Sequence, residues 1–224
     1  MINPLELLDI NRILITVFGY PLSYIECAGT IFTIWCVWLT TRAKVLSWPV
    51  GIIGTVLFGI LFYQIQLYSD LFEQIYFLIS GFMGWWIWLH PKGIDWNPGK
   101  ELRITKNSRR ENVFYLAIIV VGTACLTFVV MHLHLWLPKY FQEPASLPLL
   151  DAFTTVLSFV AQWLLVRKRL ESWILWIVVD VIAVGLYWFK GVKFISLEYL
   201  LFCFLAVLGL WRWMQQYKAE HKTV

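Results

Sequence analysis

The chain has 224 residues, of which 60% are hydrophobic and only 14% are charged. With a mean hydropathy of +0.69, this composition is typical of an integral membrane protein. The 14 Trp, 10 Tyr and 16 Phe side chains also suit a membrane and argue against a secreted, disordered or nucleic-acid-binding chain. The net charge of +4 is therefore interpreted by its position along the membrane, and no nucleic-acid partner is expected.

Residues 1–21 are expected to form an interfacial segment. Arg12 is the single base there, it follows Glu6 and Asp9, and no apolar run ending in small residues comes after it, so no cleaved signal peptide is expected. Apolar side chains recur at a helical spacing, which predicts a short helix lying on the membrane surface. These residues are Leu5, Leu8, Leu14, Ile15 and Phe18.

Seven later segments are long and apolar enough to cross a bilayer core about 30 Å thick, which takes roughly 20 helical residues. The sequence therefore predicts an all-α integral membrane protein with seven transmembrane helices. The predicted spans are 22–41, 45–66, 70–90, 112–135, 149–167, 172–190 and 194–214.

The basic residues predict the orientation of these spans. Fourteen Lys and Arg residues fall on one side and four on the other. Because positive residues concentrate in the cytoplasm, the N-terminus is predicted outside and the C-terminus inside. The richest loop, from Lys92 to Arg110, is expected to set this topology and to contact lipid headgroups.

An internal repeat appears when the chain is shifted by 125 residues without a gap. The shift superposes two triplets of helices and leaves the fourth helix between them, which predicts two parallel triple-helix bundles in a 3+1+3 order. Parallel repeats are a transporter architecture with the substrate site between the halves. The matched pairs include Trp38/Trp163, Arg42/Arg167, Trp48/Trp173, Glu73/Glu198 and Gly84/Gly209.

The repeat also predicts the division of the chain. The predicted parts are the interfacial segment 1–21, a first bundle 22–90, a basic loop with the linker helix and an outer loop 91–148, a second bundle 149–214, and a cytoplasmic tail 215–224.

The sixth span carries the strongest candidate site. Trp173, Trp176 and Asp180 are spaced i, i+3 and i+7, which places two indoles and a carboxylate on one helix face. Asp180 lies roughly 10 Å deeper than Trp173, where a carboxylate needs a polar cavity or a partner. Indole faces beside a negative charge suit a flat cationic heteroaromatic ring. The alternative is that the tryptophans form an interfacial belt and that Asp180 pairs within the bundle.

Two further polar residues are candidates. Gln74, about one turn inside the third span, could hold an amide or ribose hydroxyls, or could bond a neighbouring helix. Glu198 occupies the place equivalent to Glu73, and an ion pair with nearby Lys190 or Lys193 is the competing role.

No residues with an evident catalytic or metal-binding role emerge, so the chain is expected not to be an enzyme and to need no cofactor. His132 and His134 are two residues apart on a predicted helix, point in different directions and cannot share one ion. The four cysteines are scattered singly, which argues against disulfides and zinc.

Several elements on this 3+1+3 frame resemble the PnuC family of bacterial vitamin-precursor transporters. The resemblance covers Tyr24 to Trp213. It implies uptake of nicotinamide riboside, a precursor of NAD, across the bacterial inner membrane by facilitated diffusion, in a homotrimer, with trapping by a cytoplasmic riboside kinase. The elements are Gln64–Tyr68, Gln74, Gly84-Trp85, Trp173–Trp176 and Ser196–Tyr199.

The resemblance also implies substrate-binding residues. Trp173 and Trp176 match a WxxW element beside the nicotinamide, Gln74 matches a polar position, and the last element adds Glu198 and Tyr199. Two residues depart from the family pattern. Asp180 stands where the family carries Asn, and Met83 stands where the family often carries Tyr. The charge of Asp180 would complement a pyridinium ring, and would equally suit the thiazolium of thiamine or another cationic vitamin.

Three alternatives therefore stay open. A transporter of thiamine or another cationic vitamin comes next after nicotinamide riboside. A sugar carrier shares the two-triplet logic but would not need Asp180. A membrane enzyme or a non-transporting receptor is the alternative from a different class.

Overall fold

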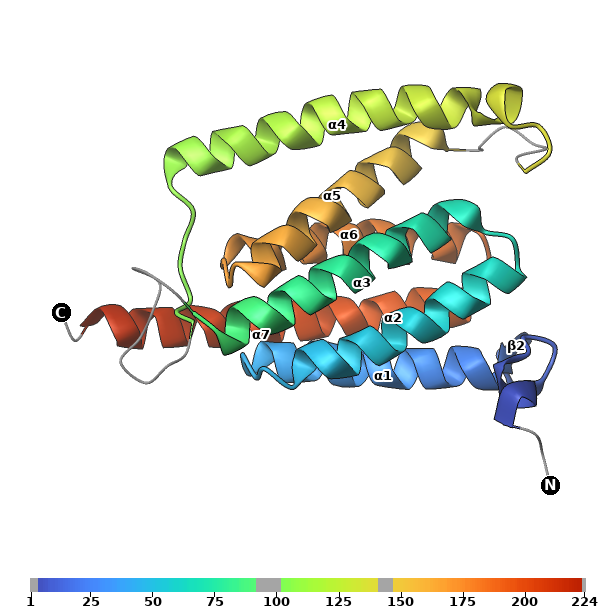
Figure 1. The fold of residues 1–224 in the computed structure, drawn as a ribbon, viewed down its shortest axis with the longest axis horizontal. Helices are drawn as coiled ribbons and strands as arrows, with labels where there is room; N and C mark the ends of the chain where they lie inside the picture. The colour runs from blue at the N-terminus through green and yellow to red at the C-terminus, as the bar shows by residue number, and fades with distance from the viewer. Residues whose placement is uncertain (1–3, 92–101, 141–146, 223–224) are drawn as a thin grey trace.

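The structure is a computed structural model that describes residues 4–91, 102–140 and 147–222. Lys92 and Lys100 of the predicted basic loop lie outside the described residues, as does part of the predicted outer loop. Seven helices account for most of the described chain (Figure 1). They are α1 (Tyr24–Thr41), α2 (Ser47–Gln64), α3 (Tyr68–Leu89), α4 (Arg109–Trp136), α5 (Pro148–Val166), α6 (Glu171–Phe189) and α7 (Lys193–Lys222).

The helices coincide with the seven predicted spans to within a few residues at most ends, and the all-helical class is confirmed. The exception is α7, which continues past the predicted end at residue 214 to Lys222. Within the described residues, five helices are long and apolar enough to cross a membrane: α2, α4, α5, α6 and residues Lys193–Glu220 of α7. Because α1 carries Glu26 and α3 carries Asp70 and Glu73, polar residues dilute these two helices, and their crossing stays a prediction.

The N-terminal segment differs from the predicted surface helix. After a single 3-10 turn at Pro4–Leu8, strands β1 (Ile13–Val17) and β2 (Tyr20–Ser23) form an antiparallel hairpin. The helical prediction was wrong because β-branched residues dominate β1, and they favour strands. Phe18 and Gly19 join the strands with φ angles of 51° and 81°, as a two-residue hairpin turn requires.

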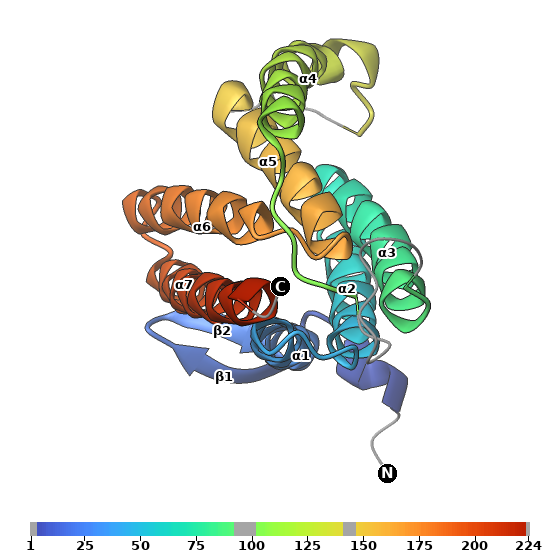
Figure 2. The same ribbon diagram turned by 90° about the vertical axis from the view of Figure 1, so that its left-hand side faces the viewer.

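The helices pack in the same order in both halves of the chain. Helix α2 lies between α1 and α3, and α6 lies between α5 and α7. The halves meet along two seams, α1 against α7 and α3 against α5 (Figure 2). Helix α4 has no counterpart in this scheme and packs on the outer side of α5.

One end of the helices, called the tryptophan end below, is built from the same contact in each half. Trp48 at the start of α2 lies against Gly84 of α3, and Trp173 at the start of α6 lies against Gly209 of α7. A Cβ atom on either glycine would come within 2.3 or 2.6 Å of the indole. Glycine is therefore required for each tryptophan to lie flat on the next helix.

Two more tryptophans join the halves at this end. Trp88 stands edge-on to Trp48, and Trp213 stands edge-on to Trp173, with ring centroids 5.3 and 5.4 Å apart. Trp88 donates its indole N–H to the Val166 carbonyl at 3.0 Å, and Trp213 donates to the Thr40 carbonyl at 3.0 Å. Each bond crosses to the other half, so the tryptophan end is a closed layer shared by both.

A segment before α4, residues 102–108 and here called the strap, covers this layer. Leu102 and Ile104 are buried in the tryptophan cluster, with exposures of 8% and 0%. Thr105 exchanges backbone hydrogen bonds with the turn between α5 and α6. The buried Lys168 of that turn donates to the Leu102 carbonyl at 2.8 Å and lies over the Trp88 ring. The strap is thus fixed to the second half.

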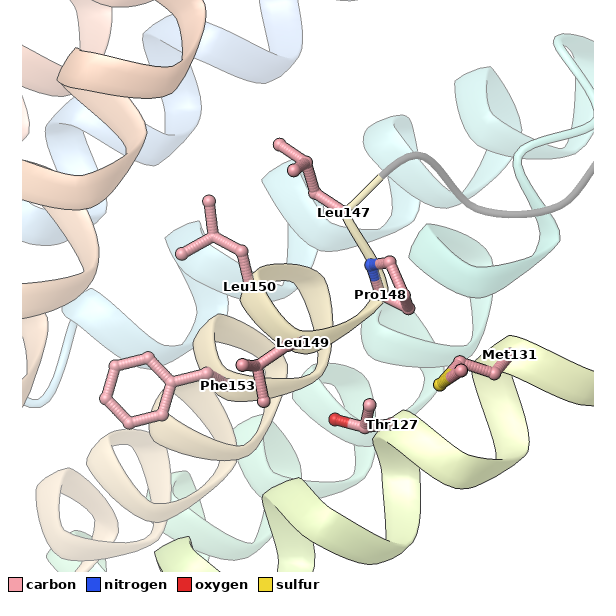
Figure 3. A pocket seen from close by; sticks show the side chains of 7 residues that line it. All are labelled: Thr127, Met131, Leu147, Pro148, Leu149, Leu150 and Phe153. Carbon is pink, nitrogen blue, oxygen red and sulfur yellow. The ribbon is translucent and has the colours of Figure 1, made fainter.

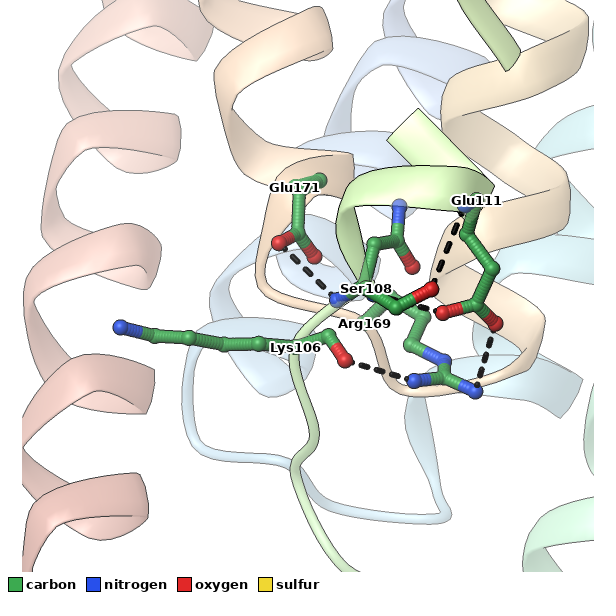
Figure 4. Close-up of polar contacts among 6 residues, drawn as sticks. Lys106, Ser108, Glu111, Arg169 and Glu171 are labelled. Carbon is green, nitrogen blue, oxygen red and sulfur yellow. Dashed lines mark hydrogen bonds and ion pairs between the residues drawn. The ribbon is translucent and has the colours of Figure 1, made fainter. Parts of the chain in front are cut away.

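Polar contacts hold the other end of the strap (Figure 4). Ser108 and Glu111 form a capping box that begins α4. Arg169 donates to the Lys106 carbonyl at 2.8 Å and reaches Glu111 at 3.4 Å, while Glu171 accepts a strap backbone N–H at 3.0 Å. Glu111 and Glu171 therefore each accept a backbone N–H of the strap.

Candidate functional site

Asp180 is the clearest candidate for a functional group within the bundle. It lies midway along α6, is only 5% exposed, and has neither a hydrogen bond nor an ion pair to any described residue. Tyr199 and Cys203 of α7 lie within electrostatic range of its carboxylate. A buried, unpaired carboxylate in a membrane helix is costly and marks a functional position.

Trp176 lies one helical turn before Asp180 and reaches the other half of the molecule. The ring is partly buried, and its centroid is 6.3 Å from that of Phe77 on α3. Residues i and i+4 share a helix face, so Trp176 and Asp180 lie on the same side of α6. The pair therefore combines an aromatic wall from both halves with a negative charge.

Trp173 occupies a different environment. It is 2% exposed and packs between Gly209 and Trp213 in the tryptophan layer. Its indole N–H is buried with no hydrogen-bond partner among the described residues, as is that of Trp48 in the first half. The geometry gives Trp173 a packing role shared with Trp48, and its expected contact with a substrate stays a prediction.

Tyr199 faces the acidic groups of the site. Its ring stacks on Tyr187 of α6 with centroids 5.5 Å apart and planes 9° apart. The carboxylates of Glu198, Asp180 and Glu73 are all within electrostatic range of its hydroxyl. Sequence reasoning missed Tyr187, although its position seven residues after Asp180 continues the polar face of α6.

Gln74 sits on α3 at the place equivalent to Tyr199 on α7, 125 residues later. Its side chain is partly buried. The Cβ atom of Gln74 lies close to α2, since a Cβ atom added to Gly59 would be 3.8 Å from it. No hydrogen bond joins its amide to another described residue. An amide in one half and a phenol in the other thus occupy matching positions on the third helix of each half.

The end of the helices opposite the tryptophans, called the carboxylate end below, joins the halves by two equivalent bonds. Thr30 of α1 donates to Glu198 of α7 at 3.0 Å, and Thr155 of α5 donates to Glu73 of α3. Both members of the pair repeat at 125 residues. The repeat contained this signal, but the threonines were not singled out from the sequence.

The ion pair considered for Glu198 is wrong. Lys190 and Lys193 lie over the rings of Tyr187 and Trp188, 6.0 Å from each centroid. Neither lysine forms an ion pair with Glu198 in the part of the chain that the structure describes. The threonine bond across the seam replaces it because Glu198 points toward α1, into the interface between the halves.

The hairpin adds a contact over the same seam. Tyr20 stacks on Phe194 of α7, with ring centroids 5.4 Å apart, and donates to Glu26 of α1 at 2.6 Å. Burial, and then the bond to Glu26, raise the pKa of the Tyr20 hydroxyl well above its ordinary range. The hydroxyl therefore stays a donor at neutral pH.

Two grooves lie beside α4, away from the predicted site residues. One has a volume of about 540 Å³ and an almost wholly apolar lining that includes Thr127, Met131 and Phe153 (Figure 3). The other has a volume of about 340 Å³ and is lined in part by Phe114, Trp163 and Arg167. His132 stacks on Trp136, and the described residues contain no cluster of His, Cys, Asp and Glu that could hold a metal.

Apolar helices repeated in two halves, with a buried carboxylate on α6 and an aromatic contact between α6 and α3, are typical of a multi-pass membrane transporter. The nicotinamide mononucleotide transporter family matches residues 23–215, and the chain belongs to that family. This confirms the resemblance to PnuC proteins. The family and its solved representative are transporters, so the chain is not placed among enzymes.

Individual transporters are also similar to this chain. The nicotinamide riboside transporter PnuC of Escherichia coli (strain K12) is 32% identical over 213 residues, covering 88% of this chain and 87% of the relative. The riboflavin/roseoflavin transporter RibM of Streptomyces davaonensis is 23% identical over 216 residues, covering 96% of both. The crystal structure of the vitamin B3 transporter PnuC has the same fold, with a TM-score of 0.66 at 23% identity over 88% of this chain and 83% of that one.

Proposed function

We propose that this protein carries nicotinamide riboside across a bacterial inner membrane by facilitated diffusion. The observation that carries the proposal is the buried Asp180, unpaired among the described residues and one turn from Trp176. Nicotinamide riboside offers the matching groups, namely a flat cationic pyridinium ring, a carboxamide and ribose hydroxyls. The name of the Escherichia coli relative supports the same substrate.

Recognition divides between the two halves. Trp176 and Phe77 supply aromatic faces from α6 and α3, and each stack with a cationic ring stabilises the complex by about 0.5 to 2 kcal/mol. Asp180 balances the positive charge. Gln74 and Tyr199 offer hydrogen bonds to the carboxamide and the ribose, and Glu198 closes the site near α1. Trp173 supports Trp176 from the tryptophan layer.

The membrane arrangement that fits this pathway is 3+1+3, with residues 22–90 and 149–214 as the two bundles and the N-terminus outside. The strap, which is rich in basic residues, then lies in the cytoplasm. Transport follows from rocking of one half against the other around the site. Phosphorylation by a cytoplasmic riboside kinase traps the substrate and makes ion coupling unnecessary, and three protomers assemble as a homotrimer.

A second candidate substrate is thiamine or another cationic vitamin. The observation that favours it is again the charge of Asp180, which complements a thiazolium as well as a pyridinium. The RibM relative is named for transport of a different vitamin, riboflavin, by a chain that covers this one almost completely. The substrate therefore has to be identified by direct competition.

Transport into sealed liposomes tests the proposal. Radiolabelled nicotinamide riboside should equilibrate across the membrane unaltered, without accumulating against its gradient. Trp176→Ala should lower the affinity roughly 2- to 30-fold, the equivalent of the lost stacking energy. Trp188→Ala, an exposed tryptophan of the same helix, is the matched control and should transport normally. Equal transport by both variants, or a chemically altered product, would overturn the proposal.

A further inference from the structure

The smaller groove beside α4 combines an apolar, aromatic lining with one cation. It has a volume of about 340 Å³ and lies between the first half of α4 and the last half of α5, and Tyr76 of α3 also lines it. Its wall is apolar and aromatic and includes Phe114, Ile118 and Trp163. Arg167 is the only cation among its lining residues and lies where α5 ends.

Arg167 is available to a ligand. The residue is exposed, stacks over Trp163 at 5.9 Å from the ring centroid, and has no ion pair with a described carboxylate. Arg109 and Arg110, also exposed, stand in the first turn of α4, where the helix dipole adds positive potential. Residues 102–111 and 167–171 together carry seven bases and two acids. Each acid accepts a backbone N–H of the strap, and Glu111 also pairs with Arg169.

The first half supplies an internal comparison. Arg42 lies over Trp38 at 3.9 Å from the ring centroid, the same pair 125 residues earlier. Helix α1, however, has no neighbour that corresponds to α4, which packs against α5. The arginine and tryptophan are therefore common to both halves, but α4, which forms one wall of the groove, packs against α5 and not against α1 among the described helices.

We infer that this groove binds an anionic phospholipid of the leaflet on the strap side. One acyl chain lies between α4 and α5 along the aromatic wall, and the phosphate contacts Arg167 and the first turn of α4. An apolar groove at the lipid-facing surface with cations at its headgroup end is complementary to this class of ligand. The larger groove in Figure 3 has no cation in its lining and cannot select a headgroup.

The lipid would also have a structural consequence. Helix α4 packs mainly against α5, and 11% of its most apolar stretch is buried inside the protein. A lipid that fills the groove adds contacts on the side of α4 that faces α3. Bound anionic lipid should therefore stabilise the folded protein in proportion to its occupancy.

The test compares lipid binding by the full chain, purified in detergent and stripped of lipid. Phosphatidylglycerol, added at increasing concentration, should be retained in native mass spectrometry and should raise the thermal midpoint, whereas phosphatidylcholine should do so far less. Arg167→Gln should weaken phosphatidylglycerol binding about fivefold, the effect expected for one basic residue at a membrane surface. Arg42→Gln should leave it unchanged.

A second variant separates the headgroup from the acyl chain. Ile118→Trp fills the groove from α4 without altering any charge, and it should reduce retention of both lipids. The inference is overturned if the two lipids are retained equally by the unchanged protein. It is also overturned if Arg42→Gln and Arg167→Gln weaken phosphatidylglycerol binding to the same extent, or if neither variant does.

Discussion

Thr30 donates a hydrogen bond to Glu198 across 168 residues of chain, with 3.0 Å between the two oxygens. The bond joins α1 to α7 at the carboxylate end, and Thr155 and Glu73 make its counterpart between α5 and α3. At the opposite end, Trp88 and Trp213 cross the same seams. The two halves are thus joined at both ends of the bundle, and the buried Asp180 lies midway along α6.

The two threonine–glutamate hydrogen bonds across the seams should contribute equally to the stability of the protein. Thr30→Val and Thr155→Val should each lower the free energy of unfolding by about 0.6 kcal/mol, up to about 1.7, which is the range for hydrogen bonds between membrane helices. Thermal unfolding in detergent measures this. Thr154→Val is the control, because its hydroxyl bonds only carbonyls of its own helix. An equal loss in the control would show that the seam bonds carry no special stability.

The tryptophan layer predicts that its glycines tolerate no side chain. Gly84→Ala and Gly209→Ala should each cost about 1 to 3 kcal/mol, because Trp48 or Trp173 has to move to admit the methyl group. Gly185→Ala, where an added Cβ meets no atom within 4 Å, should be neutral or stabilising by up to about 1 kcal/mol. Denaturant or thermal titration of the three variants checks this order, and a neutral Gly209→Ala would contradict it.

The capping box of α4 predicts a pH-dependent contribution to stability. The Ser108 backbone N–H, the Ser108 hydroxyl and Arg169 hold the pKa of Glu111 below its ordinary value of 4.5. Since the folded state favours the charged form, the contribution is present above pH 4.5 and is lost as the pH falls through the lowered pKa.

The thermal midpoint of the unchanged protein should therefore exceed that of Glu111→Gln at pH 7, and the difference should shrink towards pH 3. A difference between the protein and Glu111→Gln that stays constant with pH would contradict the assignment.

The sequence alone was sufficient for the helices and for the repeat. Hydrophobic length located all seven helices, and the shift of 125 residues anticipated that Trp48 and Trp173 would be equivalent. The 125-residue repeat did not predict which of the equivalent residues contact the other half of the protein. Trp173 and Trp176 share a helix face, yet one packs on Gly209 while the other reaches Phe77. That difference depends on the neighbouring helices rather than on spacing.

The N-terminal segment shows the other limit. The apolar residues from Leu8 to Phe18 fit the spacing of a helix and also that of a strand. In the structure, a two-residue turn at Phe18 and Gly19 pairs the segment as a hairpin. The strap was likewise invisible in the sequence. Its basic residues indicated a surface loop. Leu102 and Ile104, on either side of Arg103, are nevertheless buried in the tryptophan cluster.

Isothermal titration of the purified protein and of Asp180→Ala with nicotinamide riboside, and in parallel with thiamine, tests the central claim most directly. We expect the unchanged protein to bind nicotinamide riboside and not thiamine, Asp180→Ala to lose at least about tenfold in affinity, equivalent to about 1.4 kcal/mol, and exposed Asp9→Asn to bind normally. Unchanged affinity in Asp180→Ala would contradict the role of the buried carboxylate. Binding of thiamine alone would contradict the substrate.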